Sequence, residues 1–514
     1  MSLDLLSQDW DFVVIGTGIG GGTVGRVLAE GGLRVLFIEK GPSGHRSERQ
    51  ALHSEVFTPE ARSLRGFWPS PITAKIDGRD SEFFAPLGAG VGGSSAFYAA
   101  TLERPERHDI DDHPHAIWPV TFDEMQPWYA QAEAMYHVCG APDPLSPEPQ
   151  IPLAKAPELD EGDAALMGEM EAGGLHPYRL HSAIRYVDGC HGCLGSKCPK
   201  PCKMDGRSAG VEPALESGNA ALLDRTEVVA LRRDGEDVST LILQRDGVEH
   251  KLTAKHVVLA GGALGSAHLL LKSEENGLAN SSGLVGRNLM FHLNEMFALW
   301  PKSKATGDGT SKTISLRDLY HKKEQRFGTV QSMGIAAGYG EILHYLRLML
   351  ARSAFRKLPF SNDLLRIPAG IAVNLLGNAK VFVGLLEDFG YEENRVRFNP
   401  ERPEILHIEY TIAPELKQRR KAFRKAIRRA FRKHRKLFLS MQPELNFGHP
   451  CGTLRFGDDP KASVLDRNCK AHDLNNLWVV DSSFMPTSFG VNPSLTIAAN
   501  ALRVGTHILQ EVRT

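Results

Sequence analysis

The chain has 514 residues, a length that predicts two to four domains at the usual roughly 100–200 residues each. Charged residues make up 24% and hydrophobic residues 42%, which excludes a wholly disordered or fibrous protein. The net charge of -1 gives no overall attraction to nucleic acid, so we expect no nucleic-acid partner.

The first residues lack the basic segment and long apolar run of a secretory signal. No stretch reaches the roughly 18 apolar residues that a membrane-spanning helix needs. We therefore expect a cytoplasmic protein. The seven cysteines are too few for a disulfide scaffold in a chain of this length.

Residues 11–39 predict a βαβ unit. Asp11–Ile15 and Arg34–Ile38 are short apolar runs of strand length. Between them, Thr23–Ala29 suits a helix that ends at a pair of glycines.

A glycine pattern lies in the first turn of this unit. Gly16, Gly18 and Gly21 form G-x-G-x-x-G, which allows a tight turn and close approach of a pyrophosphate to the helix N-terminus. Glu39 ends the second strand, where a carboxylate accepts hydrogen bonds from an adenosine ribose. The pattern predicts a dinucleotide site; the alternative is a glycine-rich turn of another βαβ fold.

Further glycine-rich segments recur at residues 86–95, 257–271 and 477–500. An NAD enzyme usually has a self-contained Rossmann block, whereas a site assembled from scattered pieces suits a flavin dinucleotide. The segments between them, which include the strand pair Arg395–Phe398 and Ile405–Tyr410, predict a second, substrate-facing domain.

Seven segments carry a family resemblance: GTGIGG (16–21), GAGVGGSSAFY (88–98), GGALGSAHLLLKS (261–273), GLVGRNLMFH (283–292), HPCGT (449–453), VVDSSFMP (479–486) and GVNPSLTIAANALR (490–503). In this order they resemble the glucose–methanol–choline family of FAD-dependent oxidoreductases, nearly end to end. The resemblance implies FAD-dependent oxidation of a CH–OH group in an alcohol, sugar or sterol-like substrate. O2 or another acceptor would then reoxidise the flavin.

The resemblance also implies an α/β fold, α+β overall, with two interleaved domains. A Rossmann-like FAD-binding domain would comprise residues 1–100, 190–290 and 450–514. A substrate-binding domain, built on an antiparallel sheet with helices, would comprise residues 101–189 and 291–449.

Two residues match the family's catalytic positions. The resemblance makes His449 the base, and an imidazole suits that role because its pKa is about 6.5. Asn492 would hold the substrate oxygen, the His/Asn arrangement of the cholesterol-oxidase and pyranose-oxidase branches. The alternatives are a core histidine and a turn residue before Pro493. His292 is a further candidate for lining the site, and a purely structural role is equally open for it.

Further residues are expected to contact FAD by the same resemblance. Val228 would meet the adenine and Asp481 the ribityl chain, although ordinary packing at strand ends is the alternative for both. The full set of expected contacts is Gly16, Gly18, Gly21, Glu39, Gly93, Ser94, Val228, Asp481, Asn492 and Pro493. Phe97 and Tyr98 stand where some members have a FAD-linking histidine, so we expect noncovalent FAD.

Four cysteines, Cys190, Cys193, Cys198 and Cys202, give C-x2-C-x4-C-x3-C. This spacing leaves open an Fe–S cluster, a zinc ion, and thiols or disulfides that stabilise the loop. The segment is similar to the region where some bacterial members hold a three-iron cluster, but those have adjacent cysteines. A cluster would favour a flavin/Fe–S electron-transfer dehydrogenase subunit that acts with a redox partner.

Residues 417–436 carry twelve Lys and Arg residues and no acidic residue. Phe423, Ile427 and Phe431 recur at helical spacing, which predicts an amphipathic helix. One interpretation is peripheral contact with an anionic membrane or an acidic partner. The alternative is a substrate-domain helix with a solvated basic face.

Overall fold

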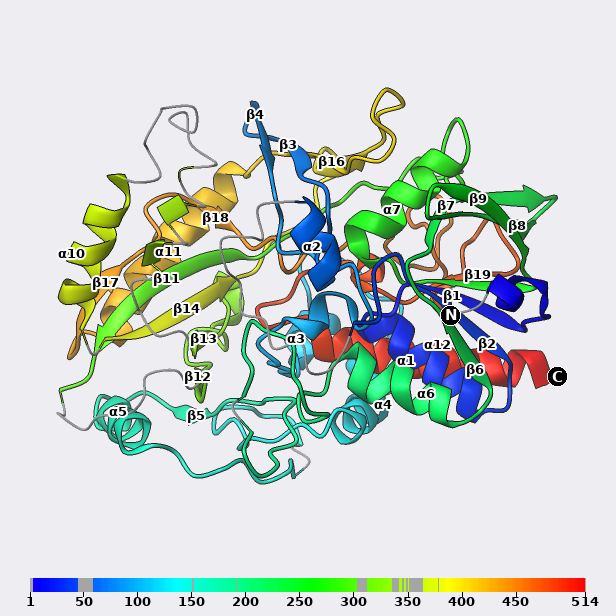
Figure 1. Cartoon of the computed structure of the whole chain (residues 1–514). Coiled ribbons are helices and arrows are strands. Elements are labelled where there is room, and N and C mark those ends of the chain that lie inside the picture. The colour runs from blue at the N-terminus through cyan, green and yellow to red at the C-terminus, as the bar shows by residue number, and fades with distance from the viewer. Residues whose placement is uncertain are drawn as a thin grey trace.

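Figure 1 shows a computed structural model of the chain. The residues described are 3–44, 59–149, 152–190, 192–302, 312–334, 342, 343, 346, 347, 350, 364–377 and 379–513. Among the helices of these ranges, none has both the length and the hydropathy of a bilayer-spanning segment.

A five-stranded sheet is parallel throughout, in the order β19-β10-β1-β2-β6. β1 and β2 are fully buried apolar runs, as expected for a parallel sheet covered on both faces. The strands span Phe12–Ile15 (β1), Val35–Ile38 (β2), Ala220–Leu223 (β6), His256–Leu259 (β10) and Leu477–Val479 (β19). The predicted βαβ unit lies at the centre of this sheet.

Helix α1 begins at Ile19, four residues before the predicted start. Glycines favour this helix poorly, but packing requires them: a Cβ on Gly20 would lie 2.1 Å from the Val480 carbonyl oxygen. A Cβ on Gly22 would lie 2.4 Å from the Gly206 carbonyl oxygen. The helices around this sheet are α1 (Ile19–Glu30), α6 (Glu212–Glu216), α7 (Gly262–Ser273), α12 (Ser494–Arg513) and the π-helical turn η4 (Gly206–Val211).

A second large sheet is antiparallel and lies at the opposite end of the molecule (Figure 1). Its order is β17-β11-β14-β13-β12-β5, with β18 also paired to β11. The strands are β5 (Pro177–Arg179), β11 (Leu293–Trp300), β12 (Ile314–Leu316), β13 (Val330–Ser332), β14 (Lys380–Leu386), β17 (Arg435–Phe438) and β18 (Glu444–Leu445). The mixed architecture with a parallel and an antiparallel sheet confirms the predicted fold class.

The predicted basic helix over 417–436 is partly wrong. Helix α11 spans Pro414–Ala430, and Arg435 and Lys436 belong to strand β17. The helix packs Phe423 and Ile427 against Gly384 of the antiparallel sheet. The chain then turns after Phe431, because residues 435–438 pair with the edge of β11.

Two smaller sheets complete the described part of the chain. The predicted strand pair forms β15 (Arg395–Arg397) and β16 (His407–Tyr410), which join β3 (Ile72–Ile76) and β4 (Arg79–Phe83). This sheet joins segments on both sides of the predicted domain boundaries, and the domain division stays a prediction. The other is β7 (Glu227–Asp234), β8 (Asp237–Arg245) and β9 (Val248–Thr253).

The remaining helices of the described ranges are short or connect these sheets in the chain. They are α2 (Pro59–Arg65), α3 (Arg107–Ile110), α4 (Phe122–Met135), α5 (Glu161–Glu171) and α10 (Arg366–Leu376), with 3-10 turns η1 (Leu3–Ser7), η3 (Gly93–Ala96), η5 (Lys323–Gln325) and η7 (Ser482–Phe484).

Candidate active site

A cavity of about 590 Å³ reaches from the parallel sheet to the antiparallel sheet. At one end it is lined by the first glycine-rich turn, Glu39 and Val228. At the other end it is lined by His449, Asn492 and side chains of β11, β13 and β14. All ten expected cofactor contacts except Gly21 line this cavity.

The glycine turn forms the first end of the cavity. Gly16 has φ +98, and a Cβ there would lie 2.4 Å from the Ala260 carbonyl oxygen. A Cβ on Gly21 would lie 2.1 Å from the Gly16 carbonyl oxygen, so Gly21 supports the turn from behind. A Cβ on Gly18, which caps α1, would meet no atom within 4 Å. The helix N-terminus therefore presents its amides to open space, as an anion site requires.

Glu39 is 5% exposed at the end of β2. Its Oε2 accepts hydrogen bonds from the amide and hydroxyl of Thr17, at 3.1 and 2.6 Å, and its Oε1 accepts from the Gly41 amide at 3.1 Å. Burial raises the pKa of this carboxyl against the effect of these donors. Thr17 therefore holds the Glu39 carboxylate in place. Thr17 was not among the predicted site residues, although it lies inside the glycine pattern.

The segment after β4 packs directly on this turn. Gly93 has φ +55, and a Cβ there would lie 3.0 Å from Gly18 Cα. The Ser94 hydroxyl accepts a hydrogen bond from the Gly88 amide at 2.9 Å. Two motifs separated by about 75 residues therefore meet through glycine backbones, which side chains at these positions would prevent.

Asp481 joins the ends of two parallel strands. Its carboxylate accepts from the amides of Gly262 and Ser483, both at 2.9 Å, and from the hydroxyl of Ser266. Burial raises its pKa against these hydrogen bonds. Val228 lies at the start of β7, next to a register shift between Val228 and Ala230. Both residues line the cavity, and their contact with a cofactor stays a prediction.

These features fit FAD. Open helix amides suit a pyrophosphate, a buried carboxylate suits a ribose, and the cavity continues without interruption to the candidate catalytic residues. The Phe97 ring stacks on Phe67 at 3.9 Å, and the Tyr98 hydroxyl donates to the Met204 carbonyl.

His449 and His292 form a pair at the other end of the cavity. Their Nδ1 atoms lie 3.2 Å apart, and His292 Nε2 lies 3.1 Å from the Phe489 carbonyl oxygen. A carbonyl only accepts, so the hydrogen of neutral His292 is on Nε2 and its Nδ1 is an acceptor. His449 Nδ1 therefore faces an acceptor in His292 and a donor in the Asn446 amide, each at 3.2 Å, and these two contacts favour opposite tautomers of His449. The contact with His292 favours the tautomer in which Nε2 has the free lone pair.

Both imidazoles are neutral in this environment. Burial lowers the pKa of His292 to about 4, against the hydrogen bond to Phe489. Burial, followed by the charges of His292 and Lys312, holds the pKa of His449 well below its usual value. A neutral histidine with a free Nε2 can accept a proton.

Asn492 is held by a residue that no motif indicated. The Gln331 side-chain amide donates to Asn492 Oδ1 at 3.1 Å. This contact uses the Asn492 oxygen and leaves its NH2 group to donate elsewhere. Asn446, three residues before His449, lies with Nδ2 at 3.2 Å from His449 Nδ1, and its Oδ1 accepts from the Gly448 amide. Asn294 and Lys312 also line this end.

The cysteine loop lies beside the cavity. Its Leu194 and Gly195 are lining residues. The Cys202 sulfur lies 3.1 Å from that of Cys198 and 3.6 Å from that of Cys190. The buried Lys203 ammonium donates to the carbonyls of Ala96, Cys193 and Ser196, and so fastens this loop to the GGSSAFY segment. The sequence separation from His449 had concealed this proximity.

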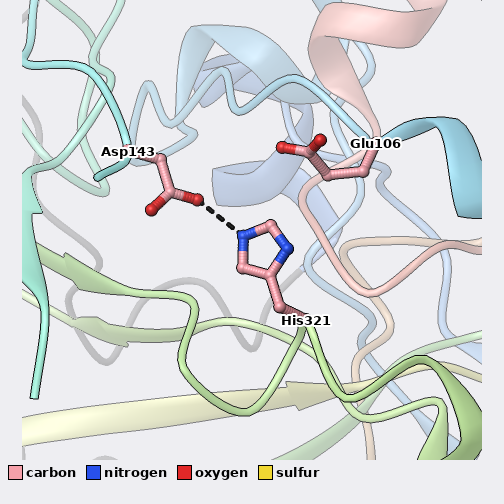
Figure 2. Close-up of side chains that lie close together, drawn as sticks. All are labelled: Glu106, Asp143 and His321. Carbon is pink, nitrogen blue, oxygen red and sulfur yellow. Dashed lines mark hydrogen bonds and ion pairs between the residues drawn. The ribbon is translucent and has the colours of Figure 1, made fainter. Parts of the chain in front are cut away.

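A second polar cluster, shown in Figure 2, brings together Glu106, Asp143 and His321. His321 Nε2 lies 2.9 Å from an Asp143 oxygen. Among the described residues, this is the one group with three potential ligand atoms within 4.8 Å of one another. The Arg317 guanidinium lies 3.3 Å from Glu106 and 3.9 Å from Asp143, and therefore already supplies the positive charge that a metal would bring.

Several cations of α11 have structural partners. Arg420 and Arg424 both form ion pairs with the buried Glu295 of β11. Arg419 donates to the carbonyls of Arg326 and Glu387 and lies over the Phe389 ring. These contacts favour the interpretation of α11 as a substrate-domain helix.

Comparison with known families agrees with this geometry. Residues 11–294 match the N-terminal domain of the GMC oxidoreductases, and residues 391–501 match the C-terminal domain. The chain belongs to the GMC oxidoreductase family. The predicted family and the predicted enzyme class, an oxidoreductase with a FAD-binding fold, are thereby confirmed.

Relatives of this GMC oxidoreductase are named as oxidases and dehydrogenases. A 6'''-hydroxyparomomycin C oxidase of Streptomyces lividus is 28% identical, covering 96% of this chain and 90% of the relative. A 2-methyl-1,2-propanediol dehydrogenase of Mycolicibacterium austroafricanum is 27% identical, with 97% and 95% covered. The large subunit of a fructose dehydrogenase of Gluconobacter japonicus is 24% identical, with both chains covered at 100%.

Solved structures show the same fold. Pyridoxine 4-oxidase from Mesorbium loti has a TM-score of 0.65 at 19% identity and covers 97% of this chain and 99% of its own. An Aspergillus oryzae formate oxidase has a TM-score of 0.68 at 16% identity, with 98% of both chains covered.

Proposed function

We propose that this GMC oxidoreductase uses FAD to oxidise a CH–OH group to a carbonyl, with His449 as the base. The observation that carries the proposal is the histidine pair: the Phe489 carbonyl sets the His292 tautomer, and the acceptor that His292 then offers favours the His449 tautomer with Nε2 free. A substrate hydroxyl at the cavity would meet a neutral proton acceptor.

Each residue at this end has a separate task. FAD bound in this cavity would supply the acceptor for the hydride of the substrate carbon and a route for the electrons to O2 or another acceptor. His449 Nε2 takes the hydroxyl proton, so the alcohol loses a proton and a hydride and becomes a carbonyl. The Asn492 amide donates to the substrate oxygen, and Gln331 keeps that amide oriented.

We also infer that FAD is held without a covalent bond, because Phe97 and Tyr98 follow the GGSS element where a linking histidine would stand. Gly16, Gly18, Glu39, Val228, Gly93, Ser94, Asp481, Asn492 and Pro493 would hold it. Acid precipitation of purified protein should release all the yellow colour into the supernatant. Colour retained in the pellet would contradict noncovalent binding.

The central test is anaerobic reduction of the bound flavin by a panel of alcohols, sugars and sterols. Bleaching of the flavin absorbance by at least one class supports the proposal. Protein that binds FAD yet is bleached by a non-alcohol reductant alone would indicate an electron-transfer role.

The cysteine loop favours a second candidate, a dehydrogenase that passes electrons onward through an Fe–S cluster. Sulfur atoms 3.1 and 3.6 Å apart lie in a loop that lines the cavity. No three of the described cysteines bring their sulfurs within 4.8 Å of one another. Cys190, Cys193, Cys198 and Cys202 would hold the cluster, which supplies one-electron transfer.

Iron and acid-labile sulfide assays on protein purified without oxygen test this candidate. Their absence, together with one thiol per cysteine in a denatured titration, would identify a structural thiol loop. Peripheral contact of the basic segment 417–436 with an anionic membrane or an acidic partner stays a prediction. Vesicle sedimentation at low and high salt tests it.

A further inference from the structure

We infer that the substrate end of the cavity is a subsite for a polyoxygenated substrate, in which Lys312 donates to a second oxygen of the molecule being oxidised. The inference rests on the proposed function and names its substrate class. Three side chains carry it: Lys312 and Asn294, which have no task in the proposed reaction, and Gln331, whose Oε1 has none.

Lys312 is a cation with no partner among the described residues. It precedes β12 and lines the cavity, and it makes no hydrogen bond or ion pair with any residue in the described ranges. Its charge acts on His449, which places the ammonium near the candidate base. Burial lowers the pKa of Lys312 to about 8, against the attraction of Glu103, so the amine still carries charge at neutral pH. An unpaired ammonium in a cavity is costly until a ligand oxygen meets it.

Two amide oxygens in the same cavity also lack donors. Asn294 Oδ1 and Gln331 Oε1 are buried and accept no hydrogen bond from the part of the chain that the structure describes. Their strands, β11 and β13, flank β14, where Leu385 pairs with Asn294 and Val383 pairs with Gln331. The side chains of Asn294, Gln331, Val383 and Leu385 all line the cavity. This part of its wall therefore combines two apolar side chains with two amide oxygens that accept no hydrogen bond from the described residues. Buried polar groups of this kind normally have partners, and a ligand would supply them here.

The combination selects the chemistry of the substrate. Asn294 and Gln331 need donors, whereas Lys312 needs an acceptor, and hydroxyl groups provide both. A sterol or a simple alkanol brings one hydroxyl, which His449 and Asn492 use, and would leave the other three groups desolvated and unpaired. A polyol satisfies all of them, and Val383 and Leu385 can pack on its C–H faces. The Lys312 partner is either a hydroxyl or the carboxylate of a sugar acid.

The experiment compares binding and flavin reduction for linear polyols and sugar acids, including sorbitol and gluconate, with n-hexanol, which has the same number of carbons. Lys312→Met keeps the stem and removes the charge. We expect it to lower kcat/KM for the polyols or sugar acids by about 10- to 100-fold, mainly by raising KM. A loss of this size corresponds to one hydrogen bond to a charged group. Turnover of n-hexanol should change less, because it loses only the effect of the Lys312 charge on His449. Lys255→Met serves as the control, because the side chain of Lys255 is 58% exposed.

Each outcome has a defined meaning. A loss confined to sugar acids identifies a carboxylate as the partner of Lys312, and a loss shared with neutral polyols identifies a hydroxyl. A preference for n-hexanol, or an equal loss for every alcohol, overturns the inference while the proposed function stands. Calorimetric titration of the FAD-loaded His449→Ala variant measures binding without turnover. The inference is wrong if this variant binds no polyol or sugar acid, or binds them equally well after the additional Lys312→Met substitution. This result would count even if no alcohol reduced the flavin.

Discussion

The two ends of the cavity are built in different ways. The dinucleotide end consists largely of backbone: a Cβ on Gly16 would lie 2.4 Å from the Ala260 carbonyl oxygen, and a Cβ on Gly93 would lie 3.0 Å from Gly18 Cα. The substrate end consists of side chains from β11, β13 and the segments around His449 and Asn492. Substitutions at the first end should abolish cofactor binding, whereas those at the second should slow the chemistry in a bound flavoprotein.

The largest expected effect belongs to the dinucleotide end. Gly16→Ala places a methyl group against Ala260 at a φ of +98. We expect complete loss of bound FAD, measured as flavin absorbance per protein after purification. Gly168→Ala, in α5 with no atom within 4 Å of the new Cβ, should keep full FAD content. Retention of FAD by Gly16→Ala would show that the close backbone approach is unnecessary.

At the substrate end, Asn492→Ala should keep its FAD and reduce it more slowly. Removing one well-placed donor to the reacting oxygen costs roughly 10²–10³-fold. Stopped-flow reduction at saturating substrate measures the rate constant. A change in KM alone would assign Asn492 to substrate binding instead.

His292 should have a smaller effect, because it acts through His449. His292→Leu removes the acceptor of the His449 Nδ1 hydrogen, with a loss of about 10-fold. His292→Gln can donate to the Phe489 carbonyl and accept from His449, so it should recover most of the rate. Equal loss in both variants would identify a packing role.

The smallest effect is expected from mild acid. His449 must be neutral to accept a proton, and its pKa is lowered well below the usual value, first by burial. The rate should therefore persist as pH falls below about 6.5 and decline only at lower pH. The pH profile of kcat/KM in the free enzyme reports this pKa. An acidic limb at or above about 6.5 would contradict a neutral, desolvated pair.

The same contrast explains what the sequence could predict. The βαβ unit, Glu39 and the strand pair near residue 400 were predictable because glycine patterns and apolar runs determine backbone geometry locally. Asn294, Gln331 and Lys312 carry no motif, and only strand pairing brings them into one cavity. The start of α1 was misplaced because tertiary packing overrides the low helix propensity of glycine.

The proximity of His292 to His449 is a further contact that sequence reasoning left undecided. The two residues are separated by 157 positions, and neither flanking motif specifies the tautomer. The Phe489 carbonyl sets the tautomer of His292, and that carbonyl belongs to a third segment.

The most direct test of the account is anaerobic flavin reduction by His449→Ala at saturating substrate. The variant should retain FAD, since the glycine turn is untouched, and should reduce it about 10²–10⁴-fold more slowly than the wild-type enzyme, the usual value of a general base. Reduction at the wild-type rate would contradict the assignment of His449 as the proton acceptor.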